Sequence, residues 1–329
     1  MFVKWHGKQS KRRTLNGGGP QGGTFGIIEF LSQSNANANC VKEDLRWKWV
    51  DDLTFIEIIN LVNIGIASYL TRAQVPNDLD INKHYIAPEN FETTKHLKYI
   101  SDWTDTQKMK LNTKKTNNMI FNFTDNYQFS TRMSINNEKI DIVEKTKLLG
   151  TVITNDLKWD DNTKEIIKKA NMRMCLLRKV VSFKPPRRDL RIIYIQYVRS
   201  ILEQSCVVWH SSLTAENRHD IERVQKNAMR IILGNEYTHY ERALDILNLK
   251  SLEERRKHLS LKFAIKGKSN PIISNIFSLK DKVHGMELRN TEIYNVNNAN
   301  TERYKNSAVP FMQRLLNEYE KEKHIKSHI

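Results

Sequence analysis

The sequence has few cysteines and no long hydrophobic run, and both features narrow the class of protein to which it can belong. Cys40, Cys175 and Cys206 are its three cysteines, too few and too scattered for a disulfide framework or a CxxC zinc site. This usage fits a reducing intracellular compartment, either nucleus or cytoplasm. No apolar run could span a bilayer, and neither a secretory signal nor a lipidation signal is present. The sequence therefore predicts no membrane partner.

Acidic residues are also in short supply. Lys and Arg number 53 against 37 Asp and Glu, which gives a formal net charge of +16 over 329 residues. Such a surplus is typical of proteins with a phosphate-rich partner, and nucleic acid is the first candidate. The hydrophobic share of 39% lies above that of disordered chains. We therefore expect a folded chain of two compact units with a polar surface.

Glycine is scarce, yet five of the 12 glycines fall in GGGPQGG at residues 17–23. Glycine permits unusual backbone angles and lets another molecule approach the main chain closely. A flexible turn has the same composition, so the meaning of this run depends on the residues after it. Phe25, Ile28 and Leu31 come next at helical spacing, which predicts a short helix over residues 24–31.

A second feature is a pair of adjacent aspartates between two extended patterns, LRWKWV and LTFIEI. The alternation predicts a hairpin with Asp51 and Asp52 at its tip. Two neighbouring carboxylates make a poorer turn than Asn-Gly, because they repel each other and neither residue favours positive φ. Carboxylates combined with substrate oxygens are the ligands that Mg²⁺ prefers. A magnesium site and a plain turn or helix cap are both open for this pair.

The remaining pattern divides the chain near residue 160. Before residue 160 we expect two helices, one over 59–70 and one around Leu97, Ile100 and Trp103. They are followed by the segment LNTKKT (111–116), a strand NNMIFNF (117–123), a hairpin over 129–143 and the segment KLLGTVI (147–153). After residue 160 we expect helices over 161–182, 188–206, 215–233 and 252–267. Ser251 and Glu254 form a capping-box pattern before the last of these. The Asn-rich segment after residue 270 shows one amphipathic helix near 308–322.

The predicted helix over 161–182 is amphipathic and basic. Its apolar face carries Ile166, Ala170, Leu177 and Val181, with either Arg173 or Met174 between them. Off that face lie Lys164, Lys168, Lys169, Arg178 and Lys179.

In this order, GGGPQGG, WKWVDD, LNTKKT and KLLGTVI resemble the palm of reverse transcriptases, most closely those of non-LTR (LINE-type) retrotransposons. Residues 197–232 are similar to the helical region that follows the thumb in these proteins, and the likeness spans most of residues 3–265. It implies an α+β fold: a partial polymerase palm (antiparallel sheet with helices) over 1–160, then an all-helical thumb and downstream region over 161–270. Residues 271–329 would be a weakly structured extension.

The resemblance also implies RNA-directed DNA synthesis with two Mg²⁺ ions, an RNA template, a DNA primer, their RNA–DNA duplex and deoxynucleoside triphosphates. Asp51 matches a direct metal ligand and Asp52 a supporting charge. Trp49 stands where the family mostly has Tyr or Phe, at the primer terminus. Lys115, or its neighbour Lys114, matches the residue thought to assist pyrophosphate departure. The positions that match nucleotide and template contacts are Gly19, Pro20, Gln21 and Gly22, and those that match the primer grip are Leu149 and Gly150.

One departure from the pattern of this family bears on the expected polymerase activity. The family's first palm motif, with another metal-ligating aspartate, precedes the PQG segment, whereas no aspartate occurs before residue 44 here. We therefore expect a truncated copy that binds nucleic acid and polymerises poorly by itself. A noncatalytic nucleic-acid-binding remnant and an RNA-splicing maturase are the alternatives.

Two smaller sets of residues could serve either packing or function. Cys206 and His210, four residues apart, could ligate a metal, but no second pair stands nearby and packing is favoured. The tryptophans Trp47, Trp49, Trp103 and Trp159 could stack on bases, yet their spacing favours positions in the core.

Overall fold

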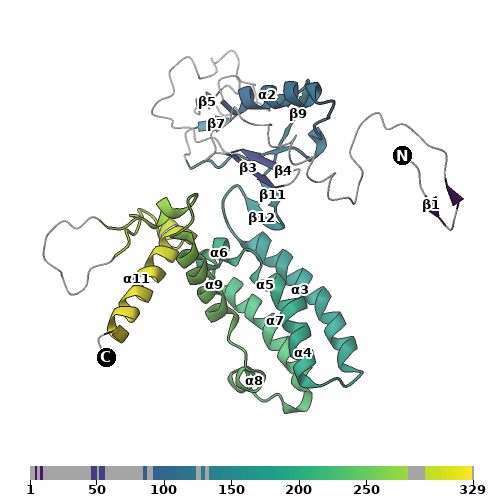
Figure 1. Cartoon of the computed structure of the whole chain (residues 1–329), viewed down its shortest axis with the longest axis vertical. Coiled ribbons are helices and arrows are strands. Elements are labelled where there is room, and N and C mark those ends of the chain that lie inside the picture. Colours follow the sequence, from purple (N-terminus) through teal and green to yellow (C-terminus); the bar gives the residue numbers. More distant parts are fainter. Residues whose placement is uncertain are drawn as a thin grey trace, which may run out of the picture. The chain divides into compact units, whose positions relative to one another are not determined.

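The computed structural model describes residues 4–5, 8–9, 46–49, 52–55, 84–86, 92–123, 127–129, 133–280 and 293–327. The chain divides into two units, Met1–Glu144 (the first unit) and Lys145–Ile329 (the helical unit), which are described separately (Figure 1). The sequence pattern predicted a boundary near residue 160. The observed division falls earlier because the hairpin over residues 145–154 packs against the first long helix of the helical unit.

The described strands of the first unit pair two by two. Three pairs are antiparallel: β1 (Lys4–Trp5) with β2 (Lys8–Gln9), β3 (Arg46–Trp49) with β4 (Asp52–Phe55), and β8 (Ser134–Ile135) with β9 (Glu138–Lys139). Two pairs are parallel: β5 (His84–Ile86) with β7 (Tyr127–Phe129), and β6 (Asn117–Asn118) with β10 (Asp141–Ile142). The helices are α2 (Glu92–Thr106) and the 3₁₀ helix η6 (Thr113–Lys115).

A small core lies under α2. Leu97, Ile135 and Ile140 are buried there, with Leu111 and Met133 packed against them. The β8–β9 hairpin turns at Asn136 and Asn137, whose φ angles of 49° and 65° suit a tight two-residue turn. The predicted strand over 117–123 is shorter than expected. Only two of its residues form β6, because the partner strand β10 is itself two residues long.

The helical unit opens with the antiparallel hairpin of β11 (Lys145–Leu148) and β12 (Thr151–Thr154). Its α-helices are α3 (Asp160–Val181), α4 (Arg187–Ile193), α5 (Ser200–Glu203), α6 (Cys206–Trp209), α7 (Ala215–Leu233), α8 (Tyr240–Leu247), α9 (Leu252–Gly267), α10 (Glu302–Lys305) and α11 (Ala308–Ser327). The π-helical turn η7 (Tyr194–Arg199) joins α4 to α5, and the 3₁₀ helices are η8 (His210–Ser212), η9 (Gly234–Glu236) and η10 (Ser274–Phe277).

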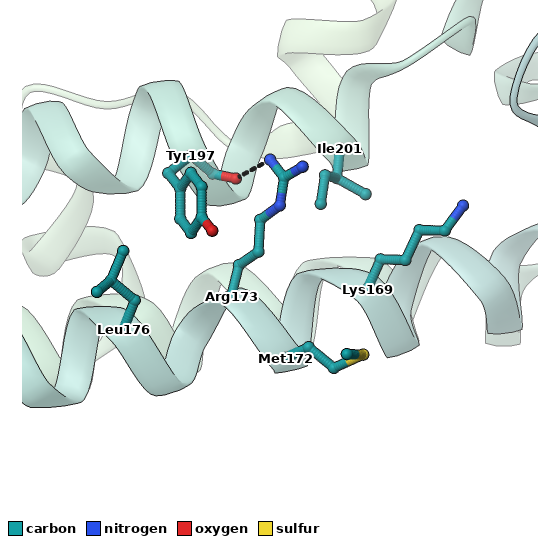
Figure 2. Close-up of a pocket in the computed structure, with 6 residues that line it drawn as sticks. All are labelled: Lys169, Met172, Arg173, Leu176, Tyr197 and Ile201. Atoms are coloured by element: carbon teal, nitrogen blue, oxygen red, sulfur yellow. Dashed lines mark hydrogen bonds between the residues drawn. The ribbon is translucent and has the colours of Figure 1, made fainter. Parts of the chain in front are cut away.

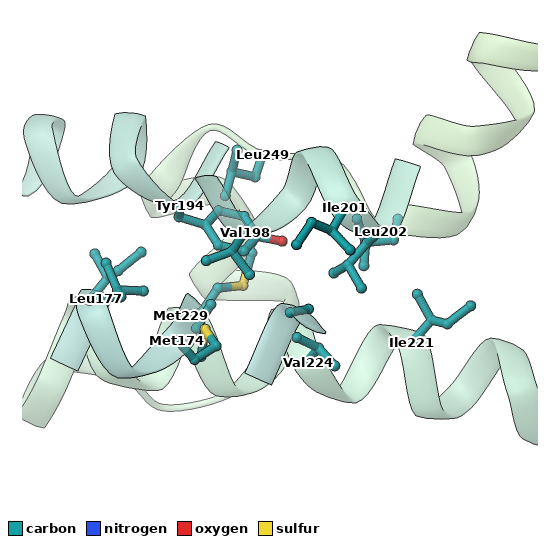
Figure 3. Close-up of a cluster of buried hydrophobic side chains, with 14 of the residues drawn as sticks. Met174, Leu177, Tyr194, Val198, Ile201, Leu202, Ile221, Val224, Met229 and Leu249 are labelled. Carbon is teal, nitrogen blue, oxygen red and sulfur yellow. The ribbon is translucent and has the colours of Figure 1, made fainter. Parts of the chain in front are cut away.

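One hydrophobic core holds α3 to α8 together (Figure 3). The helix α3 places Ile166, Ala170, Met174 and Leu177 in it, at the spacing that keeps side chains on one face of a helix. Met174, rather than Arg173, is therefore the core residue at the position left open by the sequence. The helix α7 packs along α3 and adds Ile221, Val224 and Met229, among others. A second cluster joins α9 to α11 through Ala264, Phe277, Tyr294, Met312 and Leu316.

Several helical predictions are confirmed. The helices α3, α7 and α9 lie where the periodicity placed them, and Ser251 Oγ accepts a hydrogen bond from Glu254 N at 3.2 Å. The predicted helix over 188–206 is instead interrupted by η7 and by Ser205, whose φ is 51°. The described residues combine helices with small sheets, which confirms the α+β class at that level. Among them, no helix is both long and apolar enough to cross a membrane.

Candidate nucleic-acid interface

The exposed face of α3 is cationic over most of its length. Since Ile166, Ala170, Met174 and Leu177 point inward, helical geometry sends Lys164, Lys168, Arg178 and Lys179 outward, and all four are exposed. The acids of α3 sit near its first turn, where the helix dipole favours negative charge. This face matches the predicted distribution of basic residues.

The β11 strand partly neutralises those acids. Lys145 Nζ lies 3.2 Å from Asp161 Oδ2, and Lys147 Nζ lies 3.7 Å from Glu165 Oε1. Glu165 also pairs with Lys169 at 3.2 Å, and the hydrogen bond from Lys169 lowers the pKa of Glu165. Because these pairs engage the acids, the positive charge farther along α3 has no acidic partner on its own helix.

A groove runs between α3 and η7 (Figure 2). It has a volume of about 320 Å³ and is lined by Lys169, Met172, Arg173, Leu176, Tyr197 and Ile201. Arg173 fixes one wall: its Nη1 donates to the Tyr197 carbonyl at 2.8 Å, and its guanidinium carbon lies 4.5 Å from the centroid of the Tyr197 ring. Such π-helical turns are frequent at functional sites.

The groove combines exposed apolar surface with positive charge. Met172 is 66% exposed and Tyr197 is 40% exposed, while Lys169 and Arg173 stand among them. Cations contact phosphates, and aromatic or aliphatic side chains can contact sugars and bases. The arrangement is suited to a nucleic-acid strand rather than to a small apolar ligand.

Two predicted site residues, Leu149 and Gly150, form the turn of the β11–β12 hairpin. Their φ angles are 46° and 87°, so both lie in the left-handed region that this tight turn requires. Gln204 Nε2 donates to the Leu149 carbonyl at 3.3 Å, and a Cβ on Gly150 would collide with the Gln204 amide group. The positive φ favours glycine at residue 150, whereas the Gln204 amide is the end of a flexible side chain and can shift. The turn presents an exposed Leu149 side chain.

The predicted aspartate hairpin is present in the backbone of the first unit. Asp52 begins β4 and pairs with Trp49 at the end of β3. Asp51, the side chains of Trp49 and Asp52, and the glycine-loop residues Gly19, Pro20, Gln21 and Gly22 lie outside the described residues.

LNTKKT forms a tight turn before β6. The backbone N–H groups of Lys115 and Thr116 both donate to the Asn112 carbonyl, at 3.0 and 3.1 Å. Lys114 and Lys115 are consequently on η6, and both are exposed. Exposure leaves either ammonium group accessible to an anionic ligand.

Within the ranges that the structure describes, no group of three or more His, Cys, Asp or Glu side chains could hold a metal ion. The carboxylates that the resemblance assigns to Mg²⁺ are those of Asp51 and Asp52. The structure gives only the Asp52 backbone, at the loop end of a hairpin, and this position is compatible with a carboxylate pair.

His210 and Cys206 are packing residues. Cys206 belongs to the main core, and His210 is buried beside it. His210 Nδ1 accepts a hydrogen bond from Arg256 Nε at 3.2 Å. Burial, reinforced by the positive charge of Arg256, lowers the pKa of His210 to about 3. The imidazole is therefore neutral at physiological pH, as a buried structural histidine should be.

Tyr197 and the exposed aromatic ring of Phe183 were not identified from the sequence. Helical spacing from the buried residues Tyr194, Val198 and Ile201 leaves Tyr197 off the core face, and that signal could have identified it. The four tryptophans named above differ in burial. Trp159 packs against the core and Trp103 is half-buried, whereas the side chains of Trp47 and Trp49 lie outside the described residues.

Comparison with known proteins finds no matching family model, no matching curated protein and no matching solved structure.

Proposed function

We propose that the chain carries palm and thumb segments of a non-LTR-type reverse transcriptase, an RNA-directed DNA polymerase. The observation that supports this most directly is the β3–β4 hairpin, which brings Asp52 opposite an aromatic residue, Trp49, at its loop end. A hairpin of this kind is what an aromatic-x-Asp-Asp motif needs in order to present its carboxylates together. The order of the other three motifs along the sequence adds to this support.

In this proposal the helical unit holds the nucleic acid. The face of α3 offers four exposed cations, and the adjoining groove offers apolar surface beside Lys169 and Arg173. Contacts with phosphates release counterions, which makes binding favourable and independent of sequence. The surface would therefore bind an RNA–DNA duplex through its backbone rather than by reading bases.

The first unit would carry the chemistry. Asp51 and Asp52 would hold Mg²⁺, which would provide Lewis-acid stabilisation of phosphoryl transfer. Asp51 would be a direct ligand, and Asp52 would hold negative charge next to it. The exposed ammonium group of Lys115 would stabilise the departing pyrophosphate. In the helical unit, the Leu149–Gly150 turn would contact the primer end.

Incorporation of labelled nucleotides on a primed RNA template tests this function. The chain by itself is expected to give little product, because the resemblance requires a further carboxylate and no aspartate occurs before residue 44. Adding a fingers and first-palm-motif segment from a related element should restore Mg²⁺-dependent synthesis. In the complemented reaction, Asp51→Ala should reduce the rate by roughly two to three orders of magnitude.

Asp102→Ala is the matched control, since Asp102 is an exposed carboxylate on α2 of the same unit. It should leave synthesis unchanged. Complemented synthesis that tolerates Asp51→Ala would show that the metal site has been assigned to the wrong residues. Robust synthesis by the chain alone would refute the requirement for a further segment.

A noncatalytic nucleic-acid-binding role is the second candidate. It is favoured by the position of the cationic face and the groove, which lie within the helical unit and use no residue of the first unit. Duplex binding without nucleotide incorporation, even after complementation, would support this role over polymerisation.

A further inference from the structure

The turn between α3 and α4 is a basic part of the described surface that continues beyond the cationic face of α3 and shares only Arg178 and Lys179 with it. We call residues 178–188, with the sequence RKVVSFKPPRR, the basic tip. It contains no acidic residue, and all five of its cations are exposed: Arg178, Lys179, Lys184, Arg187 and Arg188. Glu236 forms an ion pair with Arg187. Glu236 thus engages one of the five cations, and the exposed Asp189 follows the tip directly, so the tip keeps a net positive charge.

Phe183 stands in the middle of the basic tip with 83% of its surface exposed. A single exposed apolar side chain is common on protein surfaces. Here the cations around Phe183 can bind an anionic partner, and the Phe183 ring can add an aromatic contact with the same partner. The ring is not among the residues of the main core, nor among those packed against that core, which do include Val180 and Val181 just before it. Phe183 is therefore free to make a contact with another molecule.

The turn that carries this ring is well fixed. Phe183 N donates to the Val180 carbonyl at 3.0 Å, and Lys184 N donates to the Val181 carbonyl at 2.9 Å. Lys184 has a φ of 52°, and two prolines follow it, which restrict the backbone further. Because the backbone of the turn is already fixed, a contact made through Phe183 costs little backbone entropy.

An aromatic ring among cations is chemically matched to single-stranded nucleic acid. The base faces of a single strand are free to stack, whereas inserting a ring into a closed duplex requires base pairs to unstack first. The nearby cations can hold the phosphates on either side of a stacked base. A convex turn can reach such a base without enclosing the strand.

We propose that the basic tip binds single-stranded nucleic acid, with Phe183 stacked on a base and the flanking cations on its phosphates. The proposal rests on the proposed function only in that the chain binds nucleic acid. It adds a contact outside the duplex, suited to an unpaired template strand.

Binding of fluorescently labelled oligonucleotides to the full chain tests the proposal. The probes are a single strand of RNA and a blunt RNA–DNA duplex, both measured at the same salt concentration. The single strand is roughly 12 nucleotides long, which is within the range of site sizes of one single-strand-binding fold. Phe183→Ala should weaken single-strand binding roughly tenfold, and leave duplex binding within about twofold. Phe183→Trp should retain single-strand affinity, and the fluorescence of the new indole should be quenched when the strand binds.

Phe263→Ala is the matched control, because Phe263 is an exposed phenylalanine on α9 in the same unit. It should bind both probes as the unmodified chain does. Equal single-strand affinity for Phe183→Ala and the unmodified chain would overturn the tip contact and leave duplex binding, and with it the proposed function, intact. An unmodified chain that binds neither probe would overturn both.

Binding to phosphatidylcholine vesicles, with and without phosphatidylserine, is measured in addition to test for a membrane surface. Binding to the anionic vesicles that depends on Phe183, without binding to the single strand, would overturn the proposal in favour of a membrane surface. Single-strand binding that depends on Phe183, with no binding to vesicles, is the expected result.

Discussion

The two units differ in how their functional residues are supported. In the described part of the first unit, each strand has one partner and the core beneath α2 centres on Leu97, Ile135 and Ile140. In the helical unit, α3 to α8 share one continuous core, and the cationic face and groove are the outer side of a helix fixed by that core. The proposed binding surface is thus supported by long-range packing, whereas the residues proposed for the chemistry lie on short hairpins and turns.

This contrast fits the separate roles that we propose for the two units. Charge on a rigid helix keeps its spacing, which suits contacts with a regular phosphate backbone. Carboxylates on a hairpin can come close together only if their turn holds its geometry when a ligand binds. Three measurements test the helical side of this comparison: substitutions at Leu202 and at Gly150, and the pH dependence expected from His210.

The largest effect is expected in the main core. Leu202 is fully buried, so Leu202→Ala should lower the free energy of unfolding by about 2–5 kcal/mol, through lost burial and the cavity left behind. Denaturant unfolding followed by helical circular dichroism is the measurement. Val208→Ala, at an exposed position nearby in sequence, is the control and should cost much less. Equal losses for the two variants would contradict the continuous core.

A dependence on pH is expected from His210. Its pKa in the folded state is lowered to about 3, below the ordinary 6.5, so the unfolded chain takes up the proton first. The stability from neutral His210 is complete above pH 6.5 and is lost progressively as the pH falls toward 3. The loss should reach about 3 kcal/mol near pH 4.5.

The contribution of His210 is isolated by comparison with His210→Asn, whose amide oxygen can accept the Arg256 hydrogen bond without titrating. The difference in unfolding free energy between the two proteins should change with pH over this window. A constant difference from pH 7 to 4.5 would mean that His210 is not held neutral by the fold.

The smallest of the three effects is expected at the β11–β12 turn. Gly150→Ala should cost about 1–2 kcal/mol through backbone strain, because φ is 87° and favours glycine. The Gln204 amide that the new Cβ would meet is the end of a flexible side chain and can shift, so a Gln204→Ala background should leave the cost of Gly150→Ala nearly unchanged. A much lower cost in that background would show that the contact with Gln204, and not the backbone, is the main cause.

The helical unit was largely predictable from local pattern. The spacing from Ile166 to Leu177 defined the buried face of α3, and Ser251 with Glu254 marked the beginning of α9. Each of these signals is contained within a few turns of one helix. The same locality explains why the β8–β9 hairpin was predicted, since its two-asparagine turn lies between its strands.

Features that depend on residues distant in sequence were not predictable. The π-helical turn and the break at Ser205 interrupt an apolar pattern that reads as one helix. The parallel pairing of β6 with β10 joins residues that no local signal connects. The groove needs Arg173 to reach the Tyr197 carbonyl, and nothing in either segment alone indicates that contact. Asp51 and Asp52 were noticed because adjacent carboxylates are unusual in a turn.

Binding of an RNA–DNA duplex across a series of salt concentrations tests the central claim most directly. The unmodified chain should lose affinity steeply as salt rises, and Lys168→Glu with Lys179→Glu should weaken binding and reduce the slope of log K against log salt by about 2. Lys262→Glu with Lys266→Glu makes the same change in net charge on the exposed side of α9, and should leave the slope near that of the unmodified chain. A flat salt dependence, or equal losses from the two pairs of substitutions, would contradict a nucleic-acid interface on α3.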